Sequence, residues 1–303
     1  MVILHSATGG KSVSTSLVTT QPAAVIPSQA DSDQQLIALW LHGHSPHTQR
    51  AYAADVQHLL TFVGGKPLAS ITLAELQAFA DSLSELSTNS RKRALSSVKS
   101  LFTFAQKLGY LRFNVGAALK TPKAKNTLAE RILTEAEVHA MIALTSSRRD
   151  QVLLRLLYAS AGRVSEVCAL CWRDVQPNGD SCQVALFGKG EKTRHVKLSK
   201  ATWQALLTLK GEAKAADPVF KSRKGGNLDE SQAWRIVHQA AQRAGIAGNV
   251  SPHWLRHSHA THALDRGATV TLVRDTLGHS SLAITSMYTH ARPTESSALH
   301  LAI

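Results

Sequence analysis

Apolar side chains recur at the three- and four-residue spacing of amphipathic helices through most of this 303-residue chain. This pattern limits the possible folds more than any other feature of the sequence. Residues 33–43 and 46–63 carry it, and the second stretch opens with Ser45 as a cap and Pro46 as the first helical residue. The main exception is residues 182–198, CQVALFGKGEKTRHVKL, which predict two short strands around a Gly-Lys-Gly turn. We therefore expect a mainly α protein with a small β-sheet or hairpin.

Two further helices are predicted before residue 110. Thr72 and Glu75 form a capping box for a short helix that runs to about Leu83. A longer helix follows from about Thr88 until Gly109 ends it. Its apolar face is made of Leu95, Val98, Leu101, Phe102 and Ala105. The basic residues on or near its early turns are Arg91, Lys92, Arg93 and Lys99.

The chain divides into two helical domains. Residues 120–126, KTPKAKN, are basic, contain a proline and show no apolar period, which is typical of an interdomain linker. Thr134 and Glu137 form a second capping box, which begins a new helical region. Residues 1–30 show no period and predict a flexible arm. The predicted boundaries are an arm at 1–30, a helical domain at 31–119, a linker at 120–130 and a second domain at 131–303.

The charge of the chain indicates a polyanionic partner. Its formal net charge is +13 and its pI is about 9.9. The charge is spread over the folded part, since residues 31–125 hold eleven Lys and Arg against six Asp and Glu. Nucleic acid is the leading candidate, although an ordinary basic soluble protein has the same composition.

Three cysteines, Cys168, Cys171 and Cys182, are too few to cross-link a secreted scaffold of this size. A reducing compartment is therefore expected, and we predict a cytoplasmic, nucleoid-associated protein. Cys168 and Cys171 form a CxxC in a helical, apolar pattern, which favours buried thiols over zinc ligands. No window approaches about 18 consecutive apolar residues, so we expect no membrane partner.

The second domain carries groups suited to breaking a phosphodiester bond without a metal. Such a reaction needs a nucleophile, positive donors for the non-bridging oxygens and a proton for the leaving oxygen. Arginine suits the second task because its planar fork matches two phosphate oxygens. His253 and Arg256 form an HxxR, which places both side chains on one helix face. The candidates in chain order are Arg163, Lys189 at the hairpin tip, His253, Arg256, His279 after Gly278, and Tyr288.

Four segments in this order resemble the tyrosine recombinase (phage integrase) family, particularly its Xer-like bacterial branch: YASAGRVSEV, GKGEKTRHVKL, HWLRHSHATHAL and LGHSSLAITSMYTH. The resemblance covers about residues 35–295. It implies a SAM-like N-terminal core-binding domain and a C-terminal catalytic domain of the DNA breaking-rejoining fold, which together grip DNA in a C shape. The implied function is DNA integration, excision, or resolution of chromosome or plasmid dimers, a role in chromosome partition.

The resemblance assigns Tyr288 as the nucleophile that forms a 3′-phosphotyrosine. Arg163, Arg256 and His279 would hold the non-bridging oxygens as negative charge builds in the transition state. The bond energy stays in the protein–DNA ester, so no cofactor, metal or ATP is implied.

The remaining roles concern protons and orientation. Lys189 would protonate the departing 5′ oxygen, and His253 would assist proton movement at the tyrosine hydroxyl or contact the phosphate. Glu166 would orient Arg163. In one departure from the family, Ala161-Gly162 precedes Arg163, whereas the family usually has Gly followed by Leu or Met. The glycine has moved by one place, which is expected to alter the local turn.

Other readings of these residues stay open. The histidines of the second domain invite a metal site, since His253 and His257 are four residues apart. No Glu follows the first of them in the HExxH manner, so His257 and His262 are expected to make structural hydrogen bonds around the pocket. The other two histidines of the group that invites a metal site are His259 and His279. DNA-backbone contacts are expected from Arg50, Arg91, Lys92, Arg93, Lys99, Lys192 and Arg194.

The expected partner is double-stranded DNA with a specific site. The resemblance implies a homo- or hetero-tetramer on two sites, with a partner recombinase or a DNA translocase as further candidates. The apolar end of the chain, residues 298–303, is a candidate for docking into a neighbouring subunit. A type IB topoisomerase is the alternative within DNA chemistry, and a DNA-binding regulator without catalysis is the alternative outside it.

Overall fold

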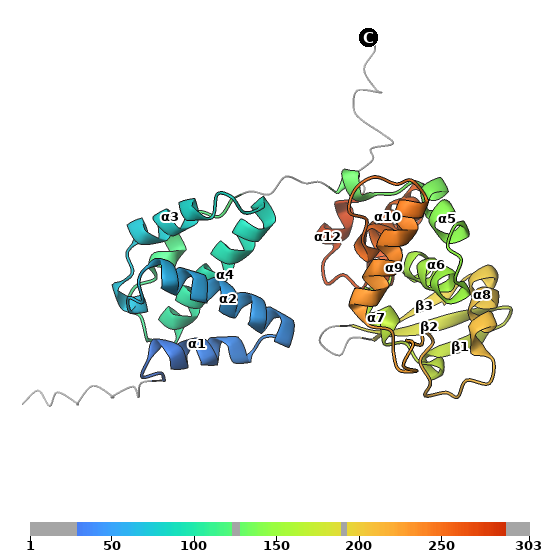
Figure 1. Ribbon diagram of the computed structural model, residues 1–303, viewed down its shortest axis with the longest axis horizontal. Helices are drawn as coiled ribbons and strands as arrows, with labels where there is room; N and C mark the ends of the chain where they lie inside the picture. Colours follow the sequence, from blue (N-terminus) through green and yellow to red (C-terminus); the bar gives the residue numbers. More distant parts are fainter. Residues whose placement is uncertain (1–28, 123–127, 189–192, 289–303) are drawn as a thin grey trace, which may run out of the picture. The chain divides into compact units, whose positions relative to one another are not determined.

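The computed structural model describes residues 29–122, 128–188 and 193–288, and the chain forms two compact units, Met1–Lys125 and Asn126–Ile303 (Figure 1). Residues 1–28 of the predicted arm, residues 123–127 of the predicted linker and residues 189–192 at the tip of the hairpin lie outside the described residues. Both units are mainly helical, which confirms the predicted fold class. No described helix has the length and apolar character needed to cross a membrane.

The N-terminal unit is a bundle of helices. Its elements are α1 (Asp33–His42), α2 (Pro46–Phe62), the 3₁₀ turn η1 (Leu68–Ser70), α3 (Leu73–Ser82), α4 (Thr88–Lys107) and the 3₁₀ turn η2 (Val115–Ala118). Ser45 caps α2 with Pro46 as its first residue, as predicted. The Thr72–Glu75 capping box at the start of α3 is also confirmed, because each side chain bonds the other residue's backbone N–H.

Helix α4 supplies the core of this unit. The predicted apolar face is confirmed, since Leu95, Val98, Leu101, Phe102 and Ala105 are fully buried. They pack with apolar residues of α1, α2 and α3 in one continuous core. Burying such a row on a 20-residue helix stabilises the bundle by about 1.5–3 kcal/mol for each large side chain. The polar face of α4 is left to the surface.

The second unit packs helices around a small sheet. Its helices are α5 (Glu135–Ala143), α6 (Arg148–Ser160), α7 (Val164–Cys168), α8 (Lys200–Lys210), α9 (Glu230–Arg243), α10 (Pro252–Asp265), α11 (Val270–Leu277) and α12 (Leu282–Ser286), with 3₁₀ turns η3 (Ala129–Arg131) and η4 (Trp172–Asp174). The Thr134–Glu137 capping box begins α5, as predicted. Helix α6 buries six of its 13 residues, and α10 packs against it.

The sheet has three antiparallel strands in the order β1 (Val175–Asn178), β2 (Ser181–Phe187) and β3 (Thr193–Leu198). The sequence predicted only β2 and β3. Strand β1 was missed because it has four residues, includes Pro177 and buries only Val175, so no alternation marks it. It lies at the sheet edge, where proline is tolerated. Strands β2 and β3 pair directly, with Val184 opposite Val196.

Candidate active site

Arg163 lies between the end of α6 and the start of α7. It is the N-cap residue of α7. Its Nη1 donates to Glu166 Oε1 at 2.7 Å, and its backbone N–H donates to Glu166 Oε2 at 2.8 Å. The Arg163 side chain stays 38% exposed while the Glu166 side chain is only 2% exposed. The buried carboxylate therefore holds the guanidinium at the surface, as the expected orienting role of Glu166 requires.

The departure from the family pattern before Arg163 has a structural explanation. Ala161 ends α6 in the left-handed conformation, with φ 48° and ψ 26°. Among the residues that the structure describes, it is the only one other than glycine with a positive φ. A Cβ at Gly162 would lie 2.6 Å from Cγ2 of Val167 and 3.1 Å from Oγ of Ser160. Position 162 therefore needs glycine because no Cβ fits there. The left-handed backbone then falls on Ala161, where it costs about 1–2 kcal/mol of conformational energy. Arg163 keeps its place.

Arg194 of β3 is a second partner of Glu166. Its Nη1 and Nη2 donate to the two carboxylate oxygens at 3.0 and 2.7 Å, and its Nε donates to the carbonyl of Thr276 at 2.8 Å. The side chain is only 12% exposed. All three nitrogens of Arg194 thus bind protein acceptors, and the contact with DNA expected for this residue stays a prediction. Arg194 links Arg163, through Glu166, to the end of α11.

Arg256 projects from α10 between the ends of two other helices. Its Nη1 donates to the carbonyl of Ala161 at 2.5 Å, and its Nη2 donates to the carbonyl of Leu277 at 2.6 Å. Both acceptors lie at helix C-termini, where the carbonyl dipoles favour a cation. The residue is 5% exposed. Burial, reinforced by the charge of Arg163, lowers the pKa of Arg256 to about 10, which still leaves it charged at neutral pH.

His279 follows the glycine that ends α11, as predicted. Gly278 has φ 66° and ψ 41°, and this left-handed cap turns the chain so that His279 leaves the helix axis. The Nδ1 of His279 lies 3.0 Å from the hydroxyl of Thr285, which is fully buried. Thr285 therefore fixes the ring and leaves Nε2 for an outside partner. No local pattern in the sequence predicts this contact between His279 and Thr285.

A cavity of about 250 Å³ joins the two ends of this arrangement. Its lining residues are Arg163, Gly188, Thr193, Arg194, Asp275, Gly278, His279 and Ser280. Two cationic side chains and a histidine thus face one small space against a single carboxylate. Gly188 and Thr193 flank the tip of the hairpin. Lys189 and Lys192 belong to that tip and lie outside the described residues, so their roles stay predictions.

Tyr288 is buried beside this cavity, with 5% of its surface exposed. Its ring stacks on His279 at a centroid distance of 6.4 Å and an interplanar angle of 11°. Its hydroxyl lies 2.8 Å from Nδ1 of His257. The sequence predicted a structural hydrogen bond for His257, and the family resemblance implied that His253 assists proton movement at the tyrosine hydroxyl or contacts the phosphate. The structure instead brings His257 to that hydroxyl.

His253 is the next ring along α10, stacked on His257 at 6.3 Å. It lines a different hollow of about 600 Å³, together with Val164, Trp234 and Arg235. Its pKa is lowered by burial and then by the nearby charges of Arg256 and Arg163. These neighbours favour the second role expected for His253, contact with a phosphate.

Burial and the two arginines set the charge states of the site. Burial, followed by the charges of Arg256 and Arg163, lowers the pKa of His279 to about 4. Burial raises the pKa of Tyr288, against a smaller lowering by Arg256. For Glu166, burial alone would raise the pKa, but the donors from Arg194 and Arg163 outweigh it and the net pKa is lowered. At neutral pH the site thus holds neutral rings, a neutral phenol and charged guanidinium groups.

The other histidines of α10 serve structure. His259 Nδ1 lies 2.8 Å from the carbonyl of Tyr158, and His262 Nδ1 lies 2.8 Å from its hydroxyl. No group of three or more His, Cys, Asp or Glu side chains in the described residues is placed to hold a metal ion. Cys168 is buried as expected, whereas Cys171 is half-buried because it follows α7 rather than lying within it.

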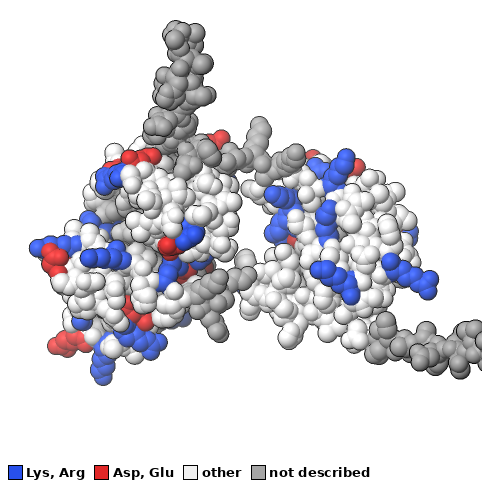
Figure 2. Space-filling view, turned by 180° about the vertical axis from the view of Figure 1, so that it is seen from behind, with Lys and Arg blue, Asp and Glu red and all other residues white. Residues whose placement is uncertain are grey.

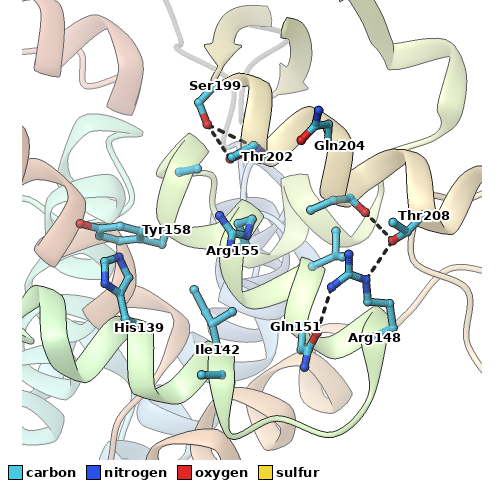
Figure 3. Close-up of a pocket in the computed structure, with 15 residues that line it drawn as sticks. His139, Ile142, Arg148, Gln151, Arg155, Tyr158, Ser199, Thr202, Gln204 and Thr208 are labelled. Carbon is cyan, nitrogen blue, oxygen red and sulfur yellow. Dashed lines mark hydrogen bonds between the residues drawn. The ribbon is translucent and has the colours of Figure 1, made fainter. Parts of the chain in front are cut away.

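A larger hollow of about 680 Å³ lies between α5, α6 and α8 (Figure 3). Tyr158, Arg155 and Arg148 line it from α6. None of the predicted catalytic residues that the structure describes contributes to its wall, so size alone does not mark the site in this protein.

Some of the residues predicted to contact DNA from the N-terminal unit are bound to other protein groups, and others are not. Figure 2 shows many more Lys and Arg than Asp and Glu on the face of this unit in view. Arg93 donates to buried Asp55 at 2.6 Å, and Lys99 donates to the carbonyls of Ala117 and Leu119. Arg50 and Lys92 are the two predicted contacts of this unit that are exposed and form no ion pair with another described residue. Arg91 lies 3.8 Å from exposed Asp81.

Comparison with known proteins agrees with this geometry. Residues 131–295 match the phage integrase family, and residues 33–109 match the N-terminal SAM-like domain of phage integrases. Tyrosine recombinase XerC of Mycobacterium sp. (strain JLS) is 33% identical over 294 residues, which cover 90% of this chain and 97% of that protein. Tyrosine recombinase XerC of Corynebacterium efficiens is 38% identical over 260 residues, 82% of each chain.

Solved structures share the fold at lower identity. The XerH site-specific recombinase bound to its difH substrate matches with a TM-score of 0.68 and 21% identity, over 90% of this chain and 84% of that one. A lambda integrase dimer bound to a COC′ core site matches with a TM-score of 0.70 and 19% identity, over 88% of this chain and 79% of that one.

Proposed function

The chain belongs to the phage integrase family and is a site-specific tyrosine recombinase, and on that premise we propose that Tyr288 forms the covalent bond to DNA. The observation that carries the assignment is the shared space of Arg163 and His279, with the Tyr288 ring stacked directly on His279. A phosphate in that cavity would meet donors on one side and the phenol on the other.

The residues divide the work around one phosphorus atom. Arg163 and the Nε2 of His279 bind the non-bridging oxygens from the cavity, and Arg256 adds its charge from behind. Of the five N–H groups of Arg256, two are used by backbone carbonyls, which leaves three for a phosphate. Donors fixed before the reaction stabilise developing charge without reorganisation, and each is worth about 10²–10³ in rate.

In the proposed reaction, the Tyr288 oxygen gives its proton to a neighbouring histidine and bonds to phosphorus, and the bond from phosphorus to the 5′ oxygen breaks. Lys189 supplies the proton that the departing 5′ oxygen takes. A 5′-hydroxyl from another strand then attacks the phosphotyrosine and gives its proton to the neutral Lys189 amine, while the Tyr288 oxygen leaves and takes its proton back from the histidine. Each exchange breaks one P–O bond and forms another, so neither ATP nor a metal enters the balance.

The finer features of the cellular role are also proposals. Solved relatives of the same fold include a lambda integrase dimer on a core site and a lambda integrase tetramer on a Holliday junction. We extend this to a tetramer of this chain, alone or with a partner recombinase, on two sites in the nucleoid. The basic face of the N-terminal unit would hold the duplex by its phosphates.

Two experiments test the proposal against its nearest alternative. Incubating the protein with nicked duplexes made from genomic fragments, then sequencing the DNA joined to protein, identifies the site. A plasmid carrying two such sites should then yield two circles or an inversion. A type IB topoisomerase would instead relax a supercoiled plasmid that lacks any site, and a regulator without catalysis would join to no fragment.

A further inference from the structure

We propose that His257 is the base that accepts the proton of Tyr288 when the tyrosine attacks DNA. This inference rests on the proposed function of Tyr288 and adds a residue to it. The carrying observation is the 2.8 Å separation of His257 Nδ1 from the Tyr288 hydroxyl, inside the usual range for a hydrogen bond.

The surroundings of His257 suit a base better than a structural group. Its ring centroid lies 5.7 Å from that of Tyr288 and 6.3 Å from that of His253. The charged or titratable groups that face it are His253, Arg256, Arg131 and His279. Burial, followed by His253 and Arg256, lowers the pKa of His257 to about 4, so the ring is neutral at pH 7 and its Nδ1 lone pair is available when Nε2 carries the proton.

Phosphate binding prepares the transfer. A DNA phosphate beside the ring adds a negative charge, which favours the protonated form and raises the pKa of His257. The proton then moves from the Tyr288 oxygen to Nδ1 as that oxygen bonds to phosphorus and the bond to the 5′ oxygen breaks. The leaving 5′ oxygen takes its proton from the acid assigned to Lys189. In the reverse step, His257 returns its proton to the departing phenol.

The neighbouring ring of His253 is placed for a different task. His253 has Arg256 and Arg163 as its main charged neighbours, whereas His257 has the phenol in hydrogen-bonding distance. One turn of α10 thus separates a phosphate contact from a proton acceptor. The Nδ1 of His279 is not placed to accept the proton of the Tyr288 hydroxyl, because that nitrogen faces the hydroxyl of Thr285.

The test measures the rate of covalent trapping on a nicked duplex across pH. His257→Ala removes the base, and His257→Asn keeps an acceptor oxygen near the place of Nδ1 that does not take up a proton. Both variants should be about 10²-fold slower at pH 7, the low end expected for a general base. Their rates should rise about tenfold per pH unit toward the native rate, because hydroxide replaces the missing base. The native rate should be level from neutral pH upward and fall in acid.

Controls separate this inference from the proposed function. Tyr158→Phe removes a hydroxyl that contacts His262 on the same helix and should trap within twofold of the native rate. A substrate with sulfur as the bridging 5′ atom should rescue Lys189→Ala, because sulfur leaves without a proton, but not His257→Ala. If the native chain traps DNA while both His257 variants match it, or are slowed equally at every pH, the base is another group. If the native chain traps nothing, the proposed function itself is wrong.

Discussion

Helices α4 and α10 both carry several basic side chains, yet they hold them in opposite ways. Helix α4 buries an aliphatic row and leaves Lys92 in solvent. Helix α10 buries several polar groups, among them Arg256, Ser258 and His262, which are all under 7% exposed. The cations of α4 face solvent or pair with other parts of the N-terminal unit, whereas Arg256 is fixed by two backbone carbonyls.

This difference separates affinity from chemistry. An exposed lysine gains affinity by displacing counterions from DNA, and its exact position matters little. A buried arginine already anchored by the protein loses no freedom when charge develops next to it. Substitutions in α4 should therefore act through salt-dependent binding, and substitutions around α10 should act through the rate of strand cleavage.

The largest effect is expected from Arg256→Lys. A lysine has one nitrogen and does not span the carbonyls of Ala161 and Leu277, so the charge loses its position. We expect cleavage to slow by about 10²–10³-fold and the free energy of unfolding to fall by about 2 kcal/mol. Single-turnover cleavage and denaturant unfolding measure both.

Arg266→Lys is the matched control for this change. Arg266 caps the same helix but pairs with Glu135 on the surface, where its side chain is 72% exposed. Its unfolding free energy should change by less than about 0.5 kcal/mol. Equal losses in the two variants would remove the contrast between buried and exposed charges.

Arg194→Met should slow cleavage by about tenfold or more and lower the unfolding free energy by about 2 kcal/mol, because Glu166 loses one of its two arginine partners. A double-mutant cycle with Glu166→Gln checks the cause. The double variant should lose clearly less than the two single losses added together. Strict additivity would show that Arg194 does not act through Glu166, and would favour the predicted contact of Arg194 with DNA.

Gly162→Ala should lower the unfolding free energy by about 1–3 kcal/mol, because its Cβ would collide with Val167. The neighbouring Ala161→Gly relieves a left-handed backbone but removes a buried methyl group, so its effect should stay within about 1 kcal/mol. Thermal or denaturant unfolding of the pair measures both. A harmless Gly162→Ala would contradict the explanation of the moved glycine.

The smallest effect is expected from Arg50→Gln and Lys92→Gln in the N-terminal unit. Each should weaken DNA binding a few-fold and reduce the slope of log affinity against log salt by about 0.9, with cleavage at saturating DNA unchanged. Lys107→Gln makes the same charge change at the far end of α4. If it reduces the slope equally, the effect reports net charge and not a phosphate contact.

Features set by local chemistry were predictable from the sequence. The two capping boxes, the HxxR face of α10 and the glycine before His279 depend on residues within one or two turns. The order of the catalytic motifs carried the family resemblance, which the comparisons confirm. Fold class followed from the helical period, because burial of apolar rows decides where helices pack.

Contacts between distant segments were not predictable in this way. Arg194 meets Glu166 across 28 residues, and His257 meets Tyr288 across 31. Nothing in the local pattern of Arg194 distinguishes a buried partner of a carboxylate from an exposed phosphate contact. The only advance sign for His257 was its place one turn after His253 on the same helix. The left-handed Ala161 likewise follows from crowding at Gly162, which only the packed structure contains.

Covalent trapping shows whether Tyr288 is the nucleophile. The native chain and Tyr288→Phe, which lacks only the hydroxyl beside His257, are incubated with the same nicked duplex and separated under denaturing conditions. We expect the native chain to form a protein–DNA adduct joined through Tyr288, identified by peptide mass. Tyr288→Phe should form no adduct despite similar DNA affinity. An adduct of equal yield with Tyr288→Phe, or one attached to another residue, would contradict that role of Tyr288.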